Sequence, residues 1–255
     1  MICPKCNLAQ LDNNTECANC GIIFEKYFAR QAHLPENGDP ITLNVHSKEL
    51  KEKMGNFIDL ARELFFHVTS PVNSFYFSGR ILVFLLIFFW GWKFVLSPIE
   101  TNYAGQSFMH LVNLPFHEAG HIIFGIFGQF IMMLGGSLGQ LLMPLICFLV
   151  ILFKTRDTFG ASVVLWWIGE SCMDLVPYIN DARDLKLILL GGVTGSEVVD
   201  YHDWEFILRK LGWLRYDHVL ANLTNTIGVA LMLISFAWGG YILFKQYKNL
   251  GNPLL

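Results

Sequence analysis

The stretch Ile81–Leu96, ILVFLLIFFWGWKFVL, has one charged side chain in sixteen residues. With its neighbours it forms an apolar segment over 80–98, close to the roughly 20 residues that a helix needs to cross the hydrocarbon core of a bilayer. The sequence therefore predicts an all-α integral membrane protein with four or five transmembrane helices. The further apolar stretches that would supply the other spans lie at 107–130, 137–153, 159–179 and 219–244.

The composition of the whole chain agrees with this fold class. Of 255 residues, 53% are hydrophobic and 15% are charged, whereas soluble domains carry roughly 25% charged residues. The formal net charge is −3, so the chain lacks the strongly basic character that nucleic-acid binding favours. These values exclude an ordinary soluble globule. They make the lipid bilayer the first expected partner and predict no nucleic-acid partner.

Two pairs of cysteines open the chain, Cys3-Pro-Lys-Cys6 and Cys17-Ala-Asn-Cys20. Each pair can present two thiolates to one tetrahedral Zn²⁺, so residues 1–28 are predicted to form a small zinc ribbon around a structural zinc ion. Two disulfides are the alternative. We expect no signal peptide before the first pair, and a cytosolic location would keep the thiols reduced, which favours zinc.

The text CPKC...CANCGIIFEKY within residues 1–28 resembles the zinc ribbons at the front of many bacterial membrane proteins. The resemblance implies a binding or regulatory role, with a protein partner for the ribbon, because four thiolates leave no open coordination position for chemistry. It also implies the inner (cell) membrane of a bacterium as the location.

Three regions are expected along the chain: the ribbon at 1–28, a linker with an amphipathic helix at 29–79, and a polytopic membrane domain at 80–255. Apolar residues recur at helical spacing over 48–68, so this helix is expected to lie on the membrane surface or to pack on the ribbon. The Gly135-Gly136 pair is expected to form a tight turn or a re-entrant bend.

Basic residues set the expected topology of this multi-pass chain. Five basic residues lie in 48–80, up to the start of the first span, and five more lie in the polar interruption at 180–218. Because cytoplasmic loops are enriched in Lys and Arg, both regions, and with them the N-terminus, are expected in the cytoplasm.

The second predicted span contains His117-Glu118-Ala119-Gly120-His121. Histidines four residues apart share one face of a helix, so both imidazoles can bind one Zn²⁺, with Glu118 beside them as the general base. Ionisable side chains in an apolar span are costly, so a functional site is the first hypothesis for them. The alternative is a pair of core histidines hydrogen-bonded to neighbouring helices. The pattern therefore predicts a catalytic zinc ion on His117 and His121.

A hydrolytic zinc ion needs a third protein ligand and one open position. The candidates are carboxylates in and just after the span 159–179, where Glu170 and Asp174 share a helix face and Asp181 follows a proline. A carboxylate at membrane depth is unfavourable unless a cation neutralises it. Solvation at a helix end is the alternative explanation, and it suits Asp181 better than the other two.

The HEAGH motif, followed later by Asp174-x-x-Pro177 and Asp181-Ala182, resembles the site-2 protease family of intramembrane zinc metalloproteases. Members of that family carry HExxH in one transmembrane helix and Asn-x-x-Pro leading to Asp-Gly in a later one. The resemblance covers about 107–182. Here Asp replaces the Asn, Ala replaces the Gly, and the distance from Pro to Asp is one residue shorter.

The resemblance implies an intramembrane metalloprotease that hydrolyses peptide bonds of membrane-associated protein or peptide substrates. It implies His117, His121 and Asp181 as ligands of the catalytic zinc ion, with Asp174 as the alternative third ligand. Glu118 would be the catalytic base. Substrate helices would need Gly or other helix-weakening residues near the cleavage point, because a helix hides its carbonyl groups in its own hydrogen bonds.

A further group, His202-Asp203-Trp204, follows a Gly-rich loop. Such a group is typical of a helix cap with an interfacial Trp. Alternatively the loop folds back on the metal, so that His202 and Asp203 are auxiliary residues of the site, as Glu170 can also be.

Three other function classes are alternatives to the protease. A catalytically inactive membrane protein that binds metal or serves as a scaffold is the main alternative to the protease. A di-iron oxidase needs several His-rich boxes, and a metal transporter is expected to show paired broken helices. The sequence offers neither pattern.

Overall fold

The computed structural model of the chain describes residues 1–32, 53, 55–56, 58–68 and 72–250. Its residues fall into two compact units, Met1–Asp59 and Leu60–Leu255. Within the region 29–79, predicted to be a linker with an amphipathic helix, residues 33–52 lie outside the described residues, and they include the first part of the helix predicted at 48–68.

The first unit holds two similar turns, one around each cysteine pair. The bridges Ile2↔Ala9 and Glu16↔Ile23 close these turns, and α1 (Phe24–Ala32) follows the second. Hydrogen bonds from the Asn7 and Gly21 amides to the Cys3 and Cys17 carbonyls, each 2.9 Å long, repeat the same geometry.

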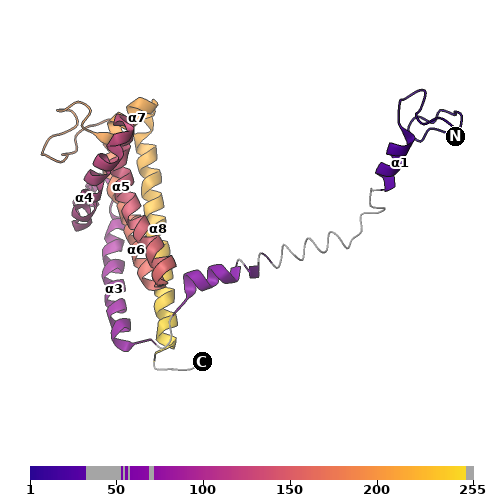
Figure 1. Cartoon of the computed structure of the whole chain (residues 1–255). Coiled ribbons are helices and arrows are strands. Elements are labelled where there is room, and N and C mark those ends of the chain that lie inside the picture. Colours follow the sequence, from indigo (N-terminus) through magenta and orange to yellow (C-terminus); the bar gives the residue numbers. More distant parts are fainter. Residues whose placement is uncertain (33–52, 54, 57, 69–71, 251–255) are drawn as a thin grey trace. The chain divides into compact units, whose positions relative to one another are not determined.

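The second unit is helical throughout its described residues, apart from turns and loops. Figure 1 shows its long helices lying side by side, with α7 at one end of the bundle. Helical residues 60–66 come first in this unit. The elements after them are α3 (Ser74–Leu96), η1 (Ile99–Thr101), α4 (Phe108–Phe124), η2 (Gly125–Phe127), α5 (Gln129–Leu149), η3 (Val150–Thr155), α6 (Thr158–Asn180), α7 (Asp203–Leu211), η4 (Leu214–Tyr216) and α8 (Asp217–Lys248).

Four helical segments of the described chain are long and apolar enough to cross a membrane: Ser74–Leu96, Gln129–Thr155, Thr158–Asn180 and Leu214–Lys248. The second predicted span, 107–130, corresponds to α4, a helix of 17 residues that is not among these four. Within the bundle α6 is central, because 67% of its most apolar window is buried, against 11% for α3. The outward side chains of α3 are large and apolar, as expected of a surface facing lipid.

Polar caps mark where the helices begin. Asn73 accepts a hydrogen bond from the Phe75 amide at the start of α3, and Asp157 accepts one from Gly160 in the first turn of α6. These side chains satisfy amides that a helix leaves without partners in its first turn. The helix starts are therefore set by local sequence.

The glycine pair at 135–136 does not form the predicted turn. Both residues lie inside α5 and are buried, and the chain turns earlier, at Gly128, whose φ of 98° favours glycine. The pair serves a close helix contact: a β-carbon on Gly135 would lie 2.7 Å from the Gly120 carbonyl oxygen of α4. Small residues let α4 and α5 approach at backbone distance.

The segment after the linker packs against the end of the bundle where α6 begins and α8 ends. Trp238 donates from Nε1 to the Phe65 carbonyl at 2.7 Å, and Thr158 donates to the His67 carbonyl at 2.8 Å. This part of the predicted amphipathic helix is therefore held by α6 and α8. The candidate site lies near the other ends of these two helices, where α6 stops and α7 begins.

Candidate metal centre

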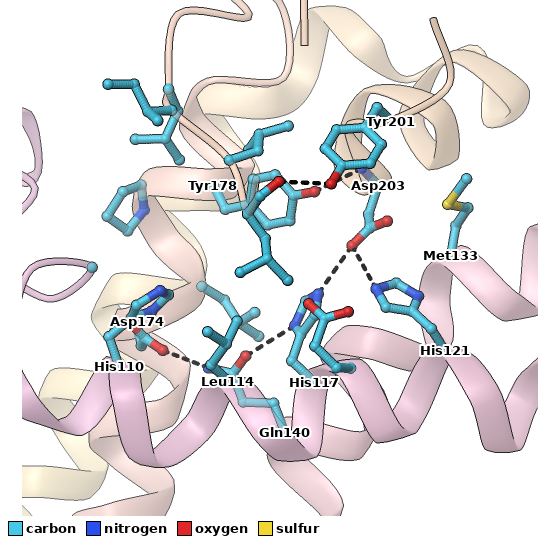
Figure 2. A pocket seen from close by; sticks show the side chains of 18 of the residues that line it. His110, Leu114, His117, His121, Met133, Gln140, Asp174, Tyr178, Tyr201 and Asp203 are labelled. Carbon is cyan, nitrogen blue, oxygen red and sulfur yellow. Dashed lines mark hydrogen bonds and ion pairs between the residues drawn. The ribbon is translucent and has the colours of Figure 1, made fainter. Parts of the chain in front are cut away.

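One face of α4 presents the imidazoles of His117 and His121, which lie one helical turn apart with ring centroids 4.9 Å apart. Both rings point toward Asp203, the first residue of α7 (Figure 2). Asp203 Oδ2 is 3.0 Å from His117 Nε2 and 3.2 Å from His121 Nε2. The three side chains are close enough together to hold one metal ion.

The spacing of these atoms suits a small divalent cation. A tetrahedral zinc ion with ligands at about 2.0–2.1 Å keeps those ligands roughly 3.4 Å apart. Burial raises the pKa of Asp203, but hydrogen bonds with the His117 and His121 rings outweigh burial and hold the pKa below its ordinary value. An ionised oxygen that faces two imidazole nitrogens forms a favourable place for a positive charge.

The outer nitrogens of both rings also have partners. His117 Nδ1 is 3.1 Å from Gln140 Oε1, and His121 Nδ1 is 2.8 Å from the Met132 carbonyl oxygen. Both partners are acceptors, so both Nδ1 atoms carry protons. In the neutral rings the lone pair is then on Nε2, facing the Asp203 carboxylate. Two lone pairs that face an anion need positive charge between them. Either each Nε2 takes up a proton and donates to Asp203, or one divalent ion replaces both protons, so this donor set fits a metal ion.

The position of Asp203 depends on the residues around it at the start of α7. His202 caps the helix by accepting from the Glu205 amide through Nδ1 at 3.1 Å. The Asp203 amide donates to the Tyr178 hydroxyl at 2.9 Å, and the His202 ring lies 4.3 Å from the Tyr178 ring. The end of α6 and the cap of α7 thus fix the carboxylate over α4.

Gly136 has no side chain, and this makes room for the His117 and His121 rings. A β-carbon at this position of α5 would lie 2.5 Å from His117 Nε2 and 2.6 Å from His121 Nε2. No side chain larger than hydrogen fits there without displacing both nitrogens. Gly136 is therefore a requirement of the candidate metal centre.

A cavity of about 360 Å³ opens beside these residues. Glu118 lines it together with His117, His121 and Asp203, and Leu187–Leu190 form an apolar wall. The volume is in the range of sites that take small molecules or short peptide segments. The cavity therefore places a carboxylate that can act as a base next to the candidate metal ligands.

The carboxylate that meets the two imidazoles is Asp203, and neither Asp181 nor Asp174 is part of this group. Asp181 accepts hydrogen bonds from the Lys186 and Leu187 amides, at 3.0 and 2.8 Å, and lies 3.6 Å from His202 Nε2. Burial raises the pKa of Asp181, and these contacts bring it below the ordinary value. The expected third ligand thus shapes the loop that leads to α7.

The other two candidate carboxylates are buried in the bundle. Asp174 binds His110 Nδ1 at 2.9 Å and reaches His117 only through Gln140. Glu170 is fully buried and accepts from Asn113 Nδ2 at 3.0 Å. Neither carboxylate touches the two imidazoles, because both sit deeper along the contact between α4 and α6.

The four N-terminal cysteines form a second possible metal site. Sγ of Cys3 is 3.7 Å from that of Cys20, and Sγ of Cys6 is 3.5 Å from that of Cys17. Thiolates bound to a tetrahedral zinc ion at about 2.3 Å lie roughly 3.8 Å apart, so the spacing fits. The predicted disulfide alternative is not formed, since all four are free. Hydrogen bonds, the largest contribution coming from the Leu8 amide, lower the pKa of Cys6 to about 6 and favour its thiolate, whereas burial raises the pKa of Cys20 to about 12.

Three residues of the candidate centre were not among those predicted from the sequence: Gln140, Gly136 and Tyr178. A polar residue in an apolar span was the available signal for Gln140. Nothing in the sequence connects Gly136 or Tyr178 to the HEAGH helix, because their roles exist only where α5 and α6 pack against it.

Comparisons of this chain with protein-family models, curated proteins and solved structures find no match.

Proposed function

We propose that this protein is a membrane-embedded, zinc-dependent peptidase that hydrolyses peptide bonds in membrane-associated substrates. One observation carries the proposal. Asp203 comes from a distant part of the chain to meet both histidines of HEAGH, and Glu118 lines the same cavity. The proposal keeps the resemblance to the site-2 protease family and replaces its third ligand by Asp203.

The proposed ligands are His117, His121 and Asp203, supported by the closeness of their side chains. Zn²⁺, when bound there, supplies Lewis acidity that acidifies water and polarises a carbonyl group. Three protein ligands leave one of the four positions free for catalysis, whereas the four-cysteine cluster leaves none.

Glu118 is the residue for proton transfer. Its carboxylate accepts a proton from the attacking water and then delivers that proton to the leaving amine nitrogen. A general base has to lie within hydrogen-bonding reach of the proton that it takes, and Glu118 adjoins His117 on the wall of the cavity.

The surroundings of the cavity suit an apolar, unwound substrate segment. Leu187–Leu190 line the cavity together with the polar residues of the centre, and Ile188 is largely exposed. A peptide that leaves a helix exposes its backbone carbonyl groups to attack and its apolar side chains to such a wall. The N-terminal four-cysteine cluster is proposed to bind a protein partner that brings substrate to the bundle.

The test is a Glu118→Gln variant compared with Glu100→Gln, an exposed glutamate after α3. Each protein is placed in proteoliposomes with a single-span reporter polypeptide that carries glycines in its span. We expect cleavage to fall by a factor of about 100 to 10,000 in Glu118→Gln, as for loss of a general base, with metal content unchanged. Glu100→Gln should cleave at the wild-type rate.

The alternative is a catalytically inactive membrane protein that binds metal or serves as a scaffold. Cleavage at the wild-type rate by a metal-loaded Glu118→Gln protein would reject Glu118 as the base and this cavity as the site of cleavage. A wild-type protein that holds its metal and cleaves none of a panel of such reporters would favour the scaffold.

A further inference from the structure

A continuous line of hydrogen bonds runs through the interior of the bundle and ends at His117. It crosses between α4, α5 and α6, and the catalytic step proposed above does not use it. Because each side chain can donate or accept only at particular atoms, it determines whether the next side chain turns a donor or an acceptor atom toward it. The members, in order, are Trp167, Asn113, Asp174, Gln140 and His117.

The line begins at a group that can only donate. Trp167 Nε1 lies 2.9 Å from Asn113 Oδ1, and the Ser171 hydroxyl lies 3.3 Å from the same oxygen. An indole N–H has no acceptor function, so the amide oxygen of Asn113 has to face Trp167. Asn113 Nδ2 then points to the carboxylates, 3.1 Å from Asp174 Oδ2 and 3.0 Å from Glu170 Oε2.

Asp174 determines the orientation of the Gln140 amide on α5. Its Oδ1 pairs with His110 Nδ1 at 2.9 Å, and its Oδ2 lies 2.9 Å from Gln140 Nε2. A carboxylate surrounded by donors accepts from each of them, so Gln140 presents its nitrogen to Asp174. A flipped amide would place its oxygen against a carboxylate oxygen, which is repulsive.

Gln140 in turn determines the protonation of His117. Its Oε1 lies 3.1 Å from His117 Nδ1 and can only accept. The proton of the neutral ring is therefore on Nδ1, and the lone pair is on Nε2, the atom that faces Asp203. Gln140 also fixes the angle of the ring, because it approaches from the side opposite Asp203 (Figure 2).

We infer that Gln140, oriented by Asp174, is a positioning residue that holds His117 in the tautomer and orientation needed to bind metal. The inference rests on the proposed metal centre. His121 differs, because its Nδ1 donates to a backbone carbonyl, that of Met132, which no substitution of a side chain removes. One ligand is thus fixed by the main chain and the other by a buried side-chain network.

The experiment compares two identical substitutions of buried glutamines, Gln140→Met and Gln246→Met. Their exposed fractions are 3% and 2%, and Gln246 lies near the end of α8. The full-length apo protein in detergent is titrated with Co²⁺. Tetrahedral Co²⁺ gives visible bands at both sites, so the histidine and carboxylate site is followed as the part of the visible spectrum that Asp203→Asn removes. The thiolate charge-transfer bands in the near ultraviolet report the four-cysteine cluster.

We expect Gln140→Met to bind Co²⁺ at the histidine site about 10- to 100-fold more weakly, the usual cost of losing a partner behind a ligand, with altered visible bands. The thiolate bands should not change, and Gln246→Met should match the wild type. Asp174→Asn, which keeps the volume of the side chain, should weaken the same site and serves if Gln140→Met does not fold by circular dichroism.

Wild-type affinity and spectrum in a folded Gln140→Met protein, or in Asp174→Asn if only that variant folds, would overturn the inference alone. A wild-type protein whose visible bands are absent, or are insensitive to Asp203→Asn, would overturn the proposed metal centre and the inference with it. The affinity is measured without substrate, so the absence of peptidase activity does not affect the result.

Discussion

The two possible metal sites of this protein are built in opposite ways. The four-cysteine cluster takes all its ligands from the first twenty residues and is held by short turns. The second site joins His117 and His121 to Asp203, which lies more than eighty residues further along the chain. The first depends on local spacing. The second depends on how four helices pack. Metal binding would therefore rest on local sequence at one site and on tertiary packing at the other.

The charge and the ligand number differ as well. Four thiolates close a tetrahedral site and serve structure. Two neutral imidazoles and one carboxylate leave a position open and carry less negative charge, which suits a Lewis acid. The complete candidate ligand set of the four-cysteine cluster can be read from one short segment. For the open site, the sequence identifies only the two histidines that lie on one helix.

The largest expected effect separates the two sites by what they contribute to folding. Stripping metal with a strong chelator should unfold residues 1–28 and leave α3–α8 helical. Among its described residues, the small unit buries only Cys3, Cys17 and Phe24 in its core, and bound zinc contributes about 10–16 kcal/mol to the folding of such segments. Hydrogen exchange followed by mass spectrometry should show protection lost in 1–28 alone. Protection that survives verified metal removal would contradict this difference.

A substitution in the bundle should affect only the second site. Gly136→Ala is expected to abolish metal binding at His117, His121 and Asp203, because its methyl group would occupy the space beside both Nε2 atoms. Metal analysis should show one ion fewer per chain, with the four-cysteine cluster still loaded. Gly79→Ala is the matched control, since a β-carbon there meets no atom within 4 Å. Equal metal content in the two variants would reject the packing argument.

A smaller effect compares Asp203, the carboxylate that lies beside the two imidazoles, with Asp181, the third ligand expected from the sequence. Asp203→Asn should weaken metal binding at this site by about 100-fold, since even residues behind a ligand cost 10- to 100-fold. Asp181→Asn should bind nearly as tightly as wild type, because Asn can still accept one of the two loop amides. Competition with a metal-sensing dye measures both. The reverse order of affinities would restore Asp181 as the third ligand.

Much of the architecture could be predicted from the sequence. Apolar segments near 80–98, 137–153, 159–179 and 219–244 correspond to the four helices that can span a membrane. These predictions depend on hydrophobicity summed over about 20 residues, which is a local property. The glycine pair was interpreted incorrectly because glycine is typical both of turns and of close helix contacts. Only the position of α4 shows which applies to Gly135 and Gly136.

The candidate site was only partly predictable, because part of it depends on contacts between distant helices. His117, Glu118 and His121 are placed together by the pitch of one helix. Asp203 lay in a group interpreted as a cap or an auxiliary loop, and in fact it begins a helix that His202 caps. Its carboxylate reaches α4 because Tyr178 holds its amide, a contact that depends on where α6 ends.

The sequence by itself determined the membrane character, the four-cysteine cluster and the pair of histidines, since each is encoded within a single segment whose geometry follows from spacing. Only the tertiary structure decided the third carboxylate, the glycine that makes room for the rings and the amide that orients one of them. Contacts between distant segments are fixed by the packing of whole helices, and no short stretch of sequence contains that information.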